Sequence, residues 1–346
     1  MKMTVLSSGI ASPHAGWLAI DELAYLLAHY FGAELLSPAI LPDSALRKLI
    51  GRERLRFAPI ESRGGDVLMV VAHGPIDLAM AASISNVRKK FSKIYGFVTD
   101  SYFTHGYPRE TALYDAITVT AHEDTAYPAK KFGIQVTQLY QGTDALRWAP
   151  REEQLRAIDL IAYGRTPPSY HAFFSRHFHQ PDSPYIYLHS PLGHQTGPDV
   201  LQERGMLFKL LHRTQISLAF HMFVEPQGNR PRSMMVTSRW LESLLAGCIV
   251  AGKRPVSRMA EEMLFWDNAT LELADEPEQA HEQILWHLNR KDDLEDQRIH
   301  NTRNVIENHD WRFRIKDICE KFKWEIPRIL NSDIDNLSLL AEKFSR

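Results

Sequence analysis

Several features that mark large classes of protein are scarce or missing in this chain. Only two of its 346 residues are cysteine, Cys248 and Cys319, and they form no CxxC pair. This argues against a disulfide framework and against a structural zinc site. No apolar run reaches the roughly 20 residues that a membrane-spanning helix needs. The apolar stretch over residues 1–10 is too short for a signal peptide, and we therefore expect a cytoplasmic protein.

An excess of charge of one sign is also missing. The chain has 40 Lys and Arg against 42 Asp and Glu, a formal net charge of −2 at pH 7. Without a global basic field, we predict that the protein binds no nucleic acid. A strict Gly-x-Gly-x-x-Gly motif is absent as well, which argues against a dehydrogenase. Hydrophobic residues make up 44% and charged residues 24%, as in ordinary globular proteins. The length favours two domains.

The first half of the chain alternates between apolar strands and amphipathic helices, a pattern typical of a parallel α/β sheet. Small residues at positions 8–16 follow the first strand and precede a helix predicted over residues 17–31. Such a loop marks the edge at which α/β sheets bind ligands. The predicted strands are residues 3–7, 66–72, 93–99 and 116–120.

The second half repeats this alternation and becomes mainly helical after residue 256. The predicted strands are residues 158–163, 185–189, 216–220 and 270–273, and the predicted helices are 169–178, 201–211, 259–265 and 277–288. Residues 295–318 form a further charged helical region.

Residues 234–256 combine a strand, a helix and a second strand in one compact unit. Residues 234–236 are predicted to be the first strand, and Thr237 and Ser238 offer hydroxyl groups that suit a helix start. Gly247 suits the left-handed end of the helix, residues 248–251 form the next strand, and Gly252 turns the chain. Arg239 and Glu242 are three residues apart and project to the same side of the helix.

This unit resembles the nucleotide-sugar-binding segment of GT-B glycosyltransferases, and is most similar to the group-1 and CgeB-like branch. The resemblance implies that Glu242 binds the ribose of the donor and that Arg239 lies near its phosphates. A helix N-terminus also favours a diphosphate, because it carries free N–H groups and a partial positive charge.

Two further segments carry the same resemblance. Residues 142–150 match a Gly-x-Asp-x-x-x-(aromatic)-x-Pro pattern that leads into the GT-B interdomain linker, and Gly164-Arg165 follows the strand that opens the donor domain. The implied fold is α/β, with two Rossmann-like domains facing each other across a cleft. We expect an acceptor domain over residues 1–150, a donor domain over 151–320, and a helical tail over 321–346 that crosses back to the first domain.

The implied activity is transfer of a sugar, hexosyltransferase-like, from a nucleotide-diphosphate sugar to a hydroxyl group in glycan, polysaccharide or glycoconjugate synthesis. Arg165, Arg239, the helix start at Thr237 and Ser238, and Lys253 are the candidates for binding the donor. No cofactor is expected. Because no Asp-x-Asp follows a strand, we also predict that no metal is needed.

The acceptor side is less defined. Asp100, His105 and His14 follow predicted strands of the first domain, and an inverting mechanism would use one of them as general base. The retaining pattern of two glutamates eight residues apart is not met, because Met234 occupies the first position. The acceptor is a glycan, a lipid-linked molecule or a protein. Basic residues between positions 46 and 65 are read as a solvated surface, with a peripheral contact at the inner membrane face left open. A GT-B-fold sugar-nucleotide epimerase and a non-catalytic GT-B-like binding protein remain alternatives.

Overall fold

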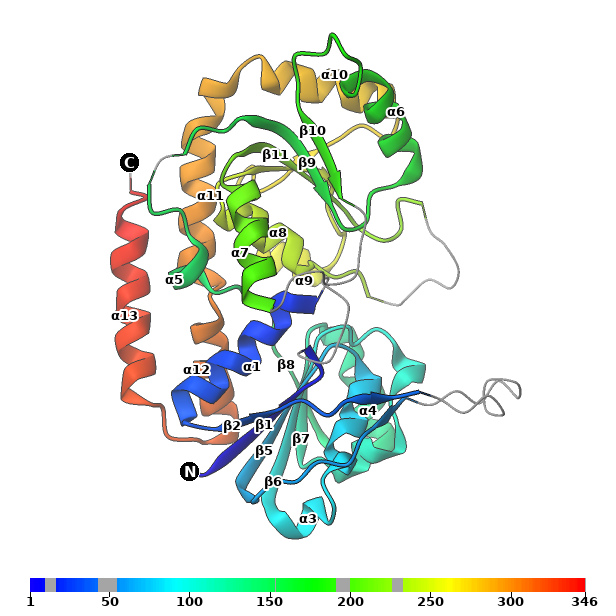
Figure 1. Ribbon diagram of the computed structural model, residues 1–346, viewed down its shortest axis with the longest axis vertical. Helices are drawn as coiled ribbons and strands as arrows, with labels where there is room; N and C mark the ends of the chain where they lie inside the picture. Colours follow the sequence, from blue (N-terminus) through cyan, green and yellow to red (C-terminus); the bar gives the residue numbers. More distant parts are fainter. Residues whose placement is uncertain (10–16, 43–54, 153, 191–199, 226–232, 346) are drawn as a thin grey trace, which may run out of the picture. The chain divides into compact units, whose positions relative to one another are not determined.

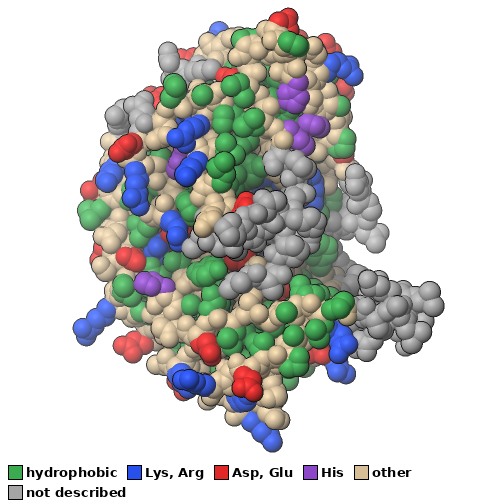
Figure 2. All heavy atoms as spheres, in the orientation of Figure 1, with side chains coloured by type: hydrophobic (Ala, Val, Ile, Leu, Met, Phe, Trp, Pro, Cys, Tyr) green, Lys and Arg blue, Asp and Glu red, His purple; other side chains and the backbone are tan. Residues whose placement is uncertain are grey.

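The computed structural model describes residues 1–9, 17–42, 55–152, 154–190, 200–225 and 233–345 (Figure 1). His14 and four of the six basic residues between positions 46 and 65 lie outside these residues. The chain forms two compact units. The first contains the described residues of Met1–Gln141, Pro231–Ser233 and Arg314–Leu330, and the second those of Gly142–Arg230, Met234–Phe313 and Asn331–Arg346. Basic and acidic side chains are interspersed on the face drawn in Figure 2.

The first unit is built on a six-stranded, fully parallel sheet. Its strands, in spatial order, are β2 (Glu34–Leu36), β1 (Met3–Ser7), β5 (Gly65–Ala72), β6 (Phe91–Val98), β7 (Ala116–Val119) and β8 (Gln135–Gln138). The central strands are apolar on both faces, as a sheet covered on both sides requires. A separate antiparallel pair joins β3 (Ile40–Leu41) to β4 (Arg56–Phe57).

Helices and 3-10 segments cover both faces of this sheet (Figure 1). Helix α1 (Leu18–Phe31) packs on one face, against β1 and β5. The other face carries a core of Leu68, Val70 and Leu78 with aromatic side chains around it. The segments that supply the remaining cover are η3 (Pro75–Ser83), α3 (Val87–Lys90), η4 (Thr104–Gly106), η5 (Arg109–Leu113), η6 (His122–Asp124) and α4 (Ala126–Phe132).

The second unit contains a five-stranded parallel sheet. Its strands, in spatial order, are β10 (Tyr187–Ser190), β9 (Ile158–Tyr163), β11 (Thr214–Phe220), β12 (Ile249–Lys253) and β13 (Leu271–Glu272). The helices that precede, connect or follow these strands are α5 (Ala145–Trp148), α6 (Pro168–Phe178), α7 (Val200–Leu211), α8 (Ser238–Leu245), α9 (Arg258–Met263), α10 (Pro277–Leu288), η7 (Lys291–Leu294) and α11 (Glu295–Asn308).

Two C-terminal helices each contribute residues to both units: α12 (Trp311–Phe322) and α13 (Arg328–Glu342). Within the first unit, Phe322 at the end of α12 stacks on Tyr95 of β6, with 4.1 Å between ring centroids. Trp324 lies edge-on to Tyr95 and to Phe31 at the end of α1, at 5.4 and 5.7 Å. These rings attach residues 314–330 to the sheet that starts at the N-terminus.

The predicted α/β class with two Rossmann-like units is confirmed. Two local predictions are wrong. Residues 234–236 are not a strand: the backbone N–H of Val236 points to the Met259 sulfur, at 3.2 Å, and β11 and β12 already pair with each other. Gly252 is not a turn but lies inside β12, where the Cβ of any other residue would be 1.9 Å from the Ala219 carbonyl oxygen.

Candidate functional site

Each parallel sheet has one position where the order of its strands reverses. In the first unit the chain passes from β1 outward to β2 and then returns to β5 on the other side of β1. In the second unit it passes from β9 to β10 and returns to β11 on the other side of β9. Open α/β sheets bind ligands beyond the carboxyl ends of the strands at such positions. The residues that follow β1 and β5, and those that follow β9, are therefore the first candidates for a site.

Beyond β9, a glycine lets an arginine approach the backbone closely. Gly164 adopts a φ of +79°, and a Cβ at this position would lie 2.3 Å from the Arg239 Nη2 atom. Arg239 donates from Nη1 to the Arg165 carbonyl oxygen at 2.8 Å. Arg165 and Arg239, both candidates for binding the donor, thus come together, although they are 74 residues apart in the chain.

This pair of arginines stands at the beginning of α8. Thr237, the exposed N-cap residue of α8, is extended and makes no side-chain cap hydrogen bond, and Ser238 is the first helical residue. Within the described part of the chain, neither Arg165 nor Arg239 forms an ion pair with a carboxylate. The Arg239 guanidinium, held at the Arg165 backbone, and a helix N-terminus therefore place positive charge together. Burial lowers the pKa of Arg239, and the charge of Arg165 is close enough to lower this pKa further. Such a site suits an anion.

Glu242 lies one turn further along α8 and is 3% exposed. It forms an ion pair with the equally buried Arg204 of α7, and its Oε2 atom accepts a hydrogen bond from the Tyr163 hydroxyl at 3.1 Å. Burial, and then the charge of Glu242, raises the pKa of Tyr163 well above its ordinary value, so this hydroxyl remains a donor. Tyr163 also contacts Ser243 at 2.9 Å, and these polar contacts fix α8 against the end of β9.

Lys253, the last residue of β12, has carboxylate partners in the structure. Its ammonium group lies 2.7 Å from Asp275 and 3.4 Å from Glu272. Burial lowers the pKa of Lys253, but its hydrogen bond to Asp275 and the charge of Glu272 outweigh this effect and raise the pKa. Lys253 is thus already paired with carboxylates, unlike the two arginines.

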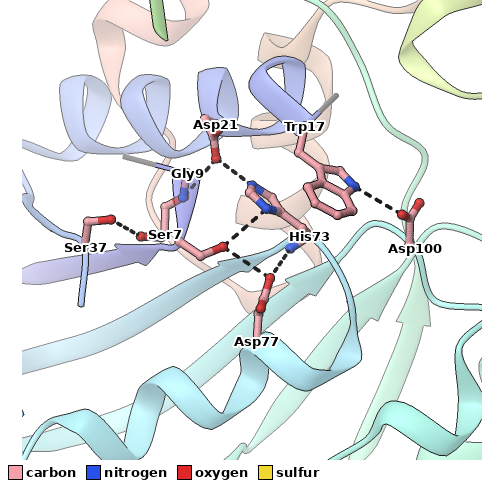
Figure 3. Close-up of polar contacts among 9 residues, drawn as sticks. Ser7, Gly9, Trp17, Asp21, Ser37, His73, Asp77 and Asp100 are labelled. Carbon is pink, nitrogen blue, oxygen red and sulfur yellow. Dashed lines mark hydrogen bonds and ion pairs between the residues drawn. The ribbon is translucent and has the colours of Figure 1, made fainter. Parts of the chain in front are cut away.

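Beyond β1 and β5, a buried polar cluster occupies the reversal position of the first sheet (Figure 3). His73, which follows β5, places its Nε2 atom 2.8 Å from Asp21 of α1 and its Nδ1 atom 3.3 Å from the Ser8 hydroxyl. Ser8 also donates to Asp77 of η3 at 3.2 Å, and the backbone N–H of His73 donates to the same Asp77 oxygen at 2.9 Å. Gly9 is required here, because its Cβ would overlap the Asp21 carboxylate.

The count of protons in this cluster defines the state of His73. With Asp21 and Asp77 ionised, both are acceptors only, and Ser8 has one proton to donate. If Ser8 donates to Asp77, both ring nitrogens of His73 must carry protons, one for Ser8 and one for Asp21. Burial lowers the pKa of His73, but the hydrogen bond and charge of Asp21, with the charge of Asp77, raise it above its ordinary value. The cluster thus favours an imidazolium between two carboxylates.

Asp100 is connected to this cluster through a tryptophan. It lies two residues beyond β6 and accepts a hydrogen bond from the Trp17 indole Nε1 atom at 3.1 Å. The Trp17 ring stacks on His73, with 5.0 Å between centroids and 15° between planes (Figure 3). Of the other two acceptor-side candidates, His105 lies in η4, with its side chain outside the described part, and His14 lies outside the described residues.

Several residues around Glu242 and in the His73 cluster were not predicted from the sequence. Ser8 and His73 follow predicted strands, which was a usable signal for each. Asp21 stands inside an apolar helix and is 2% exposed, and a carboxylate on such a helix is itself a signal. Arg204 gave no comparable signal. In the described part of the chain, no three His, Cys, Asp or Glu side chains are grouped so that they could hold a metal ion.

Comparisons with known proteins bear on the family of residues 193–320 and on the fold. Residues 193–320 match the model of a family described as "Glycosyl transferase-like". No curated protein matched the chain. An alpha-glucosyltransferase solved with UDP and a 13-mer DNA is similar over 93% of this chain and 100% of its own, with 12% identity and a TM-score of 0.58. An alpha-glucosyltransferase in complex with UDP is similar over 93% of this chain and 100% of its own, with 10% identity and a TM-score of 0.56.

A glycosyltransferase from Rickettsia africae ESF-5 is similar over 93% of this chain and 98% of its own, with 9% identity and a TM-score of 0.50. At these identities the likeness establishes the fold, which is the GT-B-type fold of these glycosyltransferases. None of the helices in the described part of the chain has the length and apolar character of a membrane span.

Proposed function

We propose that the protein is a glycosyltransferase that moves a sugar from a nucleotide-diphosphate sugar to an acceptor hydroxyl. The observation that carries this proposal is the pair Arg165 and Arg239, which lie together at the start of α8 with no carboxylate partner among the described residues. The family match over residues 193–320 includes Arg239 and supports the same activity.

The chemistry follows from where charge develops. When the bond between the sugar and the diphosphate breaks, negative charge grows on the departing phosphate. Guanidinium groups and backbone N–H groups that are already in place stabilise that charge without reorganisation. In this proposal Thr237 and Ser238 add their hydroxyl groups to the phosphate site, and Lys253 contributes at longer range because it is already paired.

Glu242 is proposed to bind the ribose. Its two oxygens already accept from Arg204 and Tyr163, but a carboxylate offers about four acceptor positions, which leaves capacity for ribose hydroxyls. The division into an acceptor domain over 1–150, a donor domain over 151–320 and a crossing tail over 321–346 belongs to the same proposal, with Asp100, His105 and His14 on the acceptor side.

The finer assignments are proposals of the same kind. The resemblance of the segment with Ser238, Arg239 and Glu242 supports the group-1 or CgeB-like branch, and a hexose as the transferred sugar is implied by that resemblance alone. A glycan, lipid-linked or protein acceptor, an absence of nucleic acid, and a cytoplasmic site with an optional membrane-surface contact stay predictions. We also propose that transfer is metal-independent, because the arginines supply the positive charge. Loss of activity in a chelator would contradict this last point.

Thermal unfolding in the presence of nucleotides tests the activity class. We expect one member of a panel of UDP, GDP, ADP, CMP and dTDP to raise the melting temperature. A ligand at about 100 times its dissociation constant adds about 2.7 kcal/mol of stability. The effect should be lost in Arg165→Met and Arg239→Met and kept in Arg176→Met, a matched change at an exposed arginine of α6. No stabilisation by any of these nucleotides, or stabilisation by NAD alone, would contradict the proposal.

A further inference from the structure

We infer that Trp17 is a positioning residue, which orients the Asp100 carboxylate for the acceptor hydroxyl and is itself held by the imidazole of His73. The inference rests on the proposed function, and it depends only on contacts within the first unit (Figure 3).

The His73 ring cannot turn within its buried site. It is 4% exposed, and its two nitrogens contact Asp21 and Ser8 from opposite sides. Its backbone N–H is bonded to Asp77 as well. A ring held by both nitrogens in a buried site has one orientation, because any rotation would leave a buried polar group unpaired.

The fixed His73 ring holds the indole ring of Trp17 in one plane. The two rings are 15° from parallel at 5.0 Å, so the indole lies flat on the imidazole. The charged form of His73 strengthens this contact, since a cation is attracted to the face of an indole ring. The sequence places Trp17 immediately before the first residue of α1, and Asp21 lies in the first turn of the same helix. One helix therefore supplies both the tryptophan and a partner of the histidine.

Because the indole ring of Trp17 is fixed, its single N–H group has one direction. That group donates to the Oδ2 atom of Asp100 at 3.1 Å. Asp100 follows β6, next to the strand that His73 follows, and its own backbone N–H donates to the His73 carbonyl oxygen at 2.8 Å. Backbone and side chain of Asp100 are thus both bonded to this cluster. A reaction in which a carboxylate positions or deprotonates a hydroxyl is faster when the carboxylate is already oriented.

Replacement of Trp17 by phenylalanine tests the role of its N–H group, because the ring that stacks on His73 is retained. The assay measures release of the nucleoside diphosphate from UDP-glucose, or from the nucleotide sugar that the panel identifies. We expect the kcat of Trp17→Phe to be about 10- to 100-fold lower than that of the wild type. KM for the donor should stay unchanged, because the arginines are untouched. The matched control is Trp286→Phe, at an exposed tryptophan of α10, which should leave both constants unchanged.

Asp100→Asn separates positioning from a general loss of structure. If Trp17 acts through Asp100, adding Trp17→Phe to Asp100→Asn should cause no further loss, whereas independent effects would multiply. The contact itself can be followed without turnover by NMR of the indole N–H groups. The Trp17 signal, assigned by its absence in Trp17→Phe, should exchange faster with water in Asp100→Ala.

The two hypotheses fail in different ways. A wild-type protein that binds no nucleoside diphosphate and releases none contradicts the proposed function. An active protein in which Trp17→Phe keeps the wild-type kcat, or in which the indole exchange rate is unchanged in Asp100→Ala, overturns the inference about Trp17 and leaves the proposed function standing.

Discussion

The pair of Arg204 and Glu242 combines two buried charges, and this makes each dependent on the other. Both side chains are almost fully buried. Replacing Glu242 by alanine would leave the Arg204 guanidinium without its carboxylate in a place with little water. We expect Glu242→Ala to lower the free energy of unfolding by about 3–5 kcal/mol, measured by urea denaturation without any nucleotide.

Two further variants make this prediction specific. Arg204→Met combined with Glu242→Leu should recover most of the loss, because neither charge is then buried. Glu307→Ala breaks a pair with Arg303 on the surface of α11 and should cost no more than about 0.5 kcal/mol. Wild-type stability in Glu242→Ala would show that the buried pair is not formed in solution.

Asp310 gives a pH dependence of stability whose sign can be worked out. This carboxyl group is fully buried, and burial, with the nearby charge of Asp144, raises its pKa from 3.8 to about 6 despite Arg312. A folded state that holds a proton more tightly than the unfolded state is favoured at low pH. The contribution of Asp310 is therefore present below about pH 4 and is lost as the pH rises to about 6.

Replacing Asp310 by asparagine should remove this dependence. We expect the difference in unfolding free energy between wild type and Asp310→Asn to change by about 2–3 kcal/mol between pH 4 and pH 6.5, in the direction that favours wild type at low pH. Urea denaturation over this range measures it. A constant difference between the two proteins would contradict the shifted pKa.

At the scale of elements, β11 and β12 approach so closely that only glycine fits at position 252. The backbone there has a φ of +152°, and a Cβ would overlap the Ala219 carbonyl group. Because the clash is with backbone, the two strands must separate to relieve it. We expect Gly252→Ala to cost at least about 3 kcal/mol, measured by thermal or urea unfolding.

The control for this change is another glycine of the same unit. Gly205 lies inside α7, and a Cβ there would meet the nearest atoms of Trp148 at 3.9 Å, an ordinary contact. Gly205→Ala should be neutral or stabilising by up to about 1 kcal/mol, because alanine favours the helix. Equal stability of the two alanine variants would exclude the described register of β11 and β12.

The elements themselves could be read from the sequence more completely than the sites. Residues 3–7 and 158–163 coincide with β1 and β9, since a buried parallel strand is an apolar run with clear limits. The wrong strand at 234–236 was an apolar run too, but Met235 and Val236 are buried outside any strand. Local pattern records burial and does not record which neighbour provides it.

The candidate sites show the same limit. Arg239 was expected near the donor phosphates from the resemblance to GT-B glycosyltransferases, and in the structure its guanidinium donates to the Arg165 backbone. The cluster of Ser8, Asp21 and His73 could not be assembled from the sequence, because it depends on β1 and β5 being neighbours across the reversal of strand order. Nothing in the spacing of these residues specifies that order.

At the scale of the whole molecule, the chain changes units after Gln141, Arg230, Ser233, Phe313 and Leu330. A fragment that ends at residue 150 would retain the complete first sheet but would lack residues 314–330. The faces of Tyr95 and Phe31 that pack on Phe322 and Trp324 would then be exposed to water.

We expect the fragment of residues 1–150 to lack cooperative thermal unfolding, because aromatic side chains that are packed in the full chain would be exposed to water in the fragment. In the full chain, Trp324→Ala should destabilise more than Trp286→Ala, since Trp324 packs on the rings of Phe31, Tyr95 and Phe322 and Trp286 is largely exposed. Calorimetry measures both. Two-state unfolding of the fragment at the wild-type temperature would contradict this account.

The same connectivity sets an order of events during synthesis. Domains generally fold as units while the chain leaves the ribosome, the N-terminal one first. Here the unit that contains Met1 is complete only after Leu330 has been made, when nearly all of the second unit is already available. The aromatic side chains of the first unit that pack on residues 314–330 therefore stay uncovered until almost the entire protein has been translated. Folding of the nascent chain is thus expected to be a late event that involves both units at once.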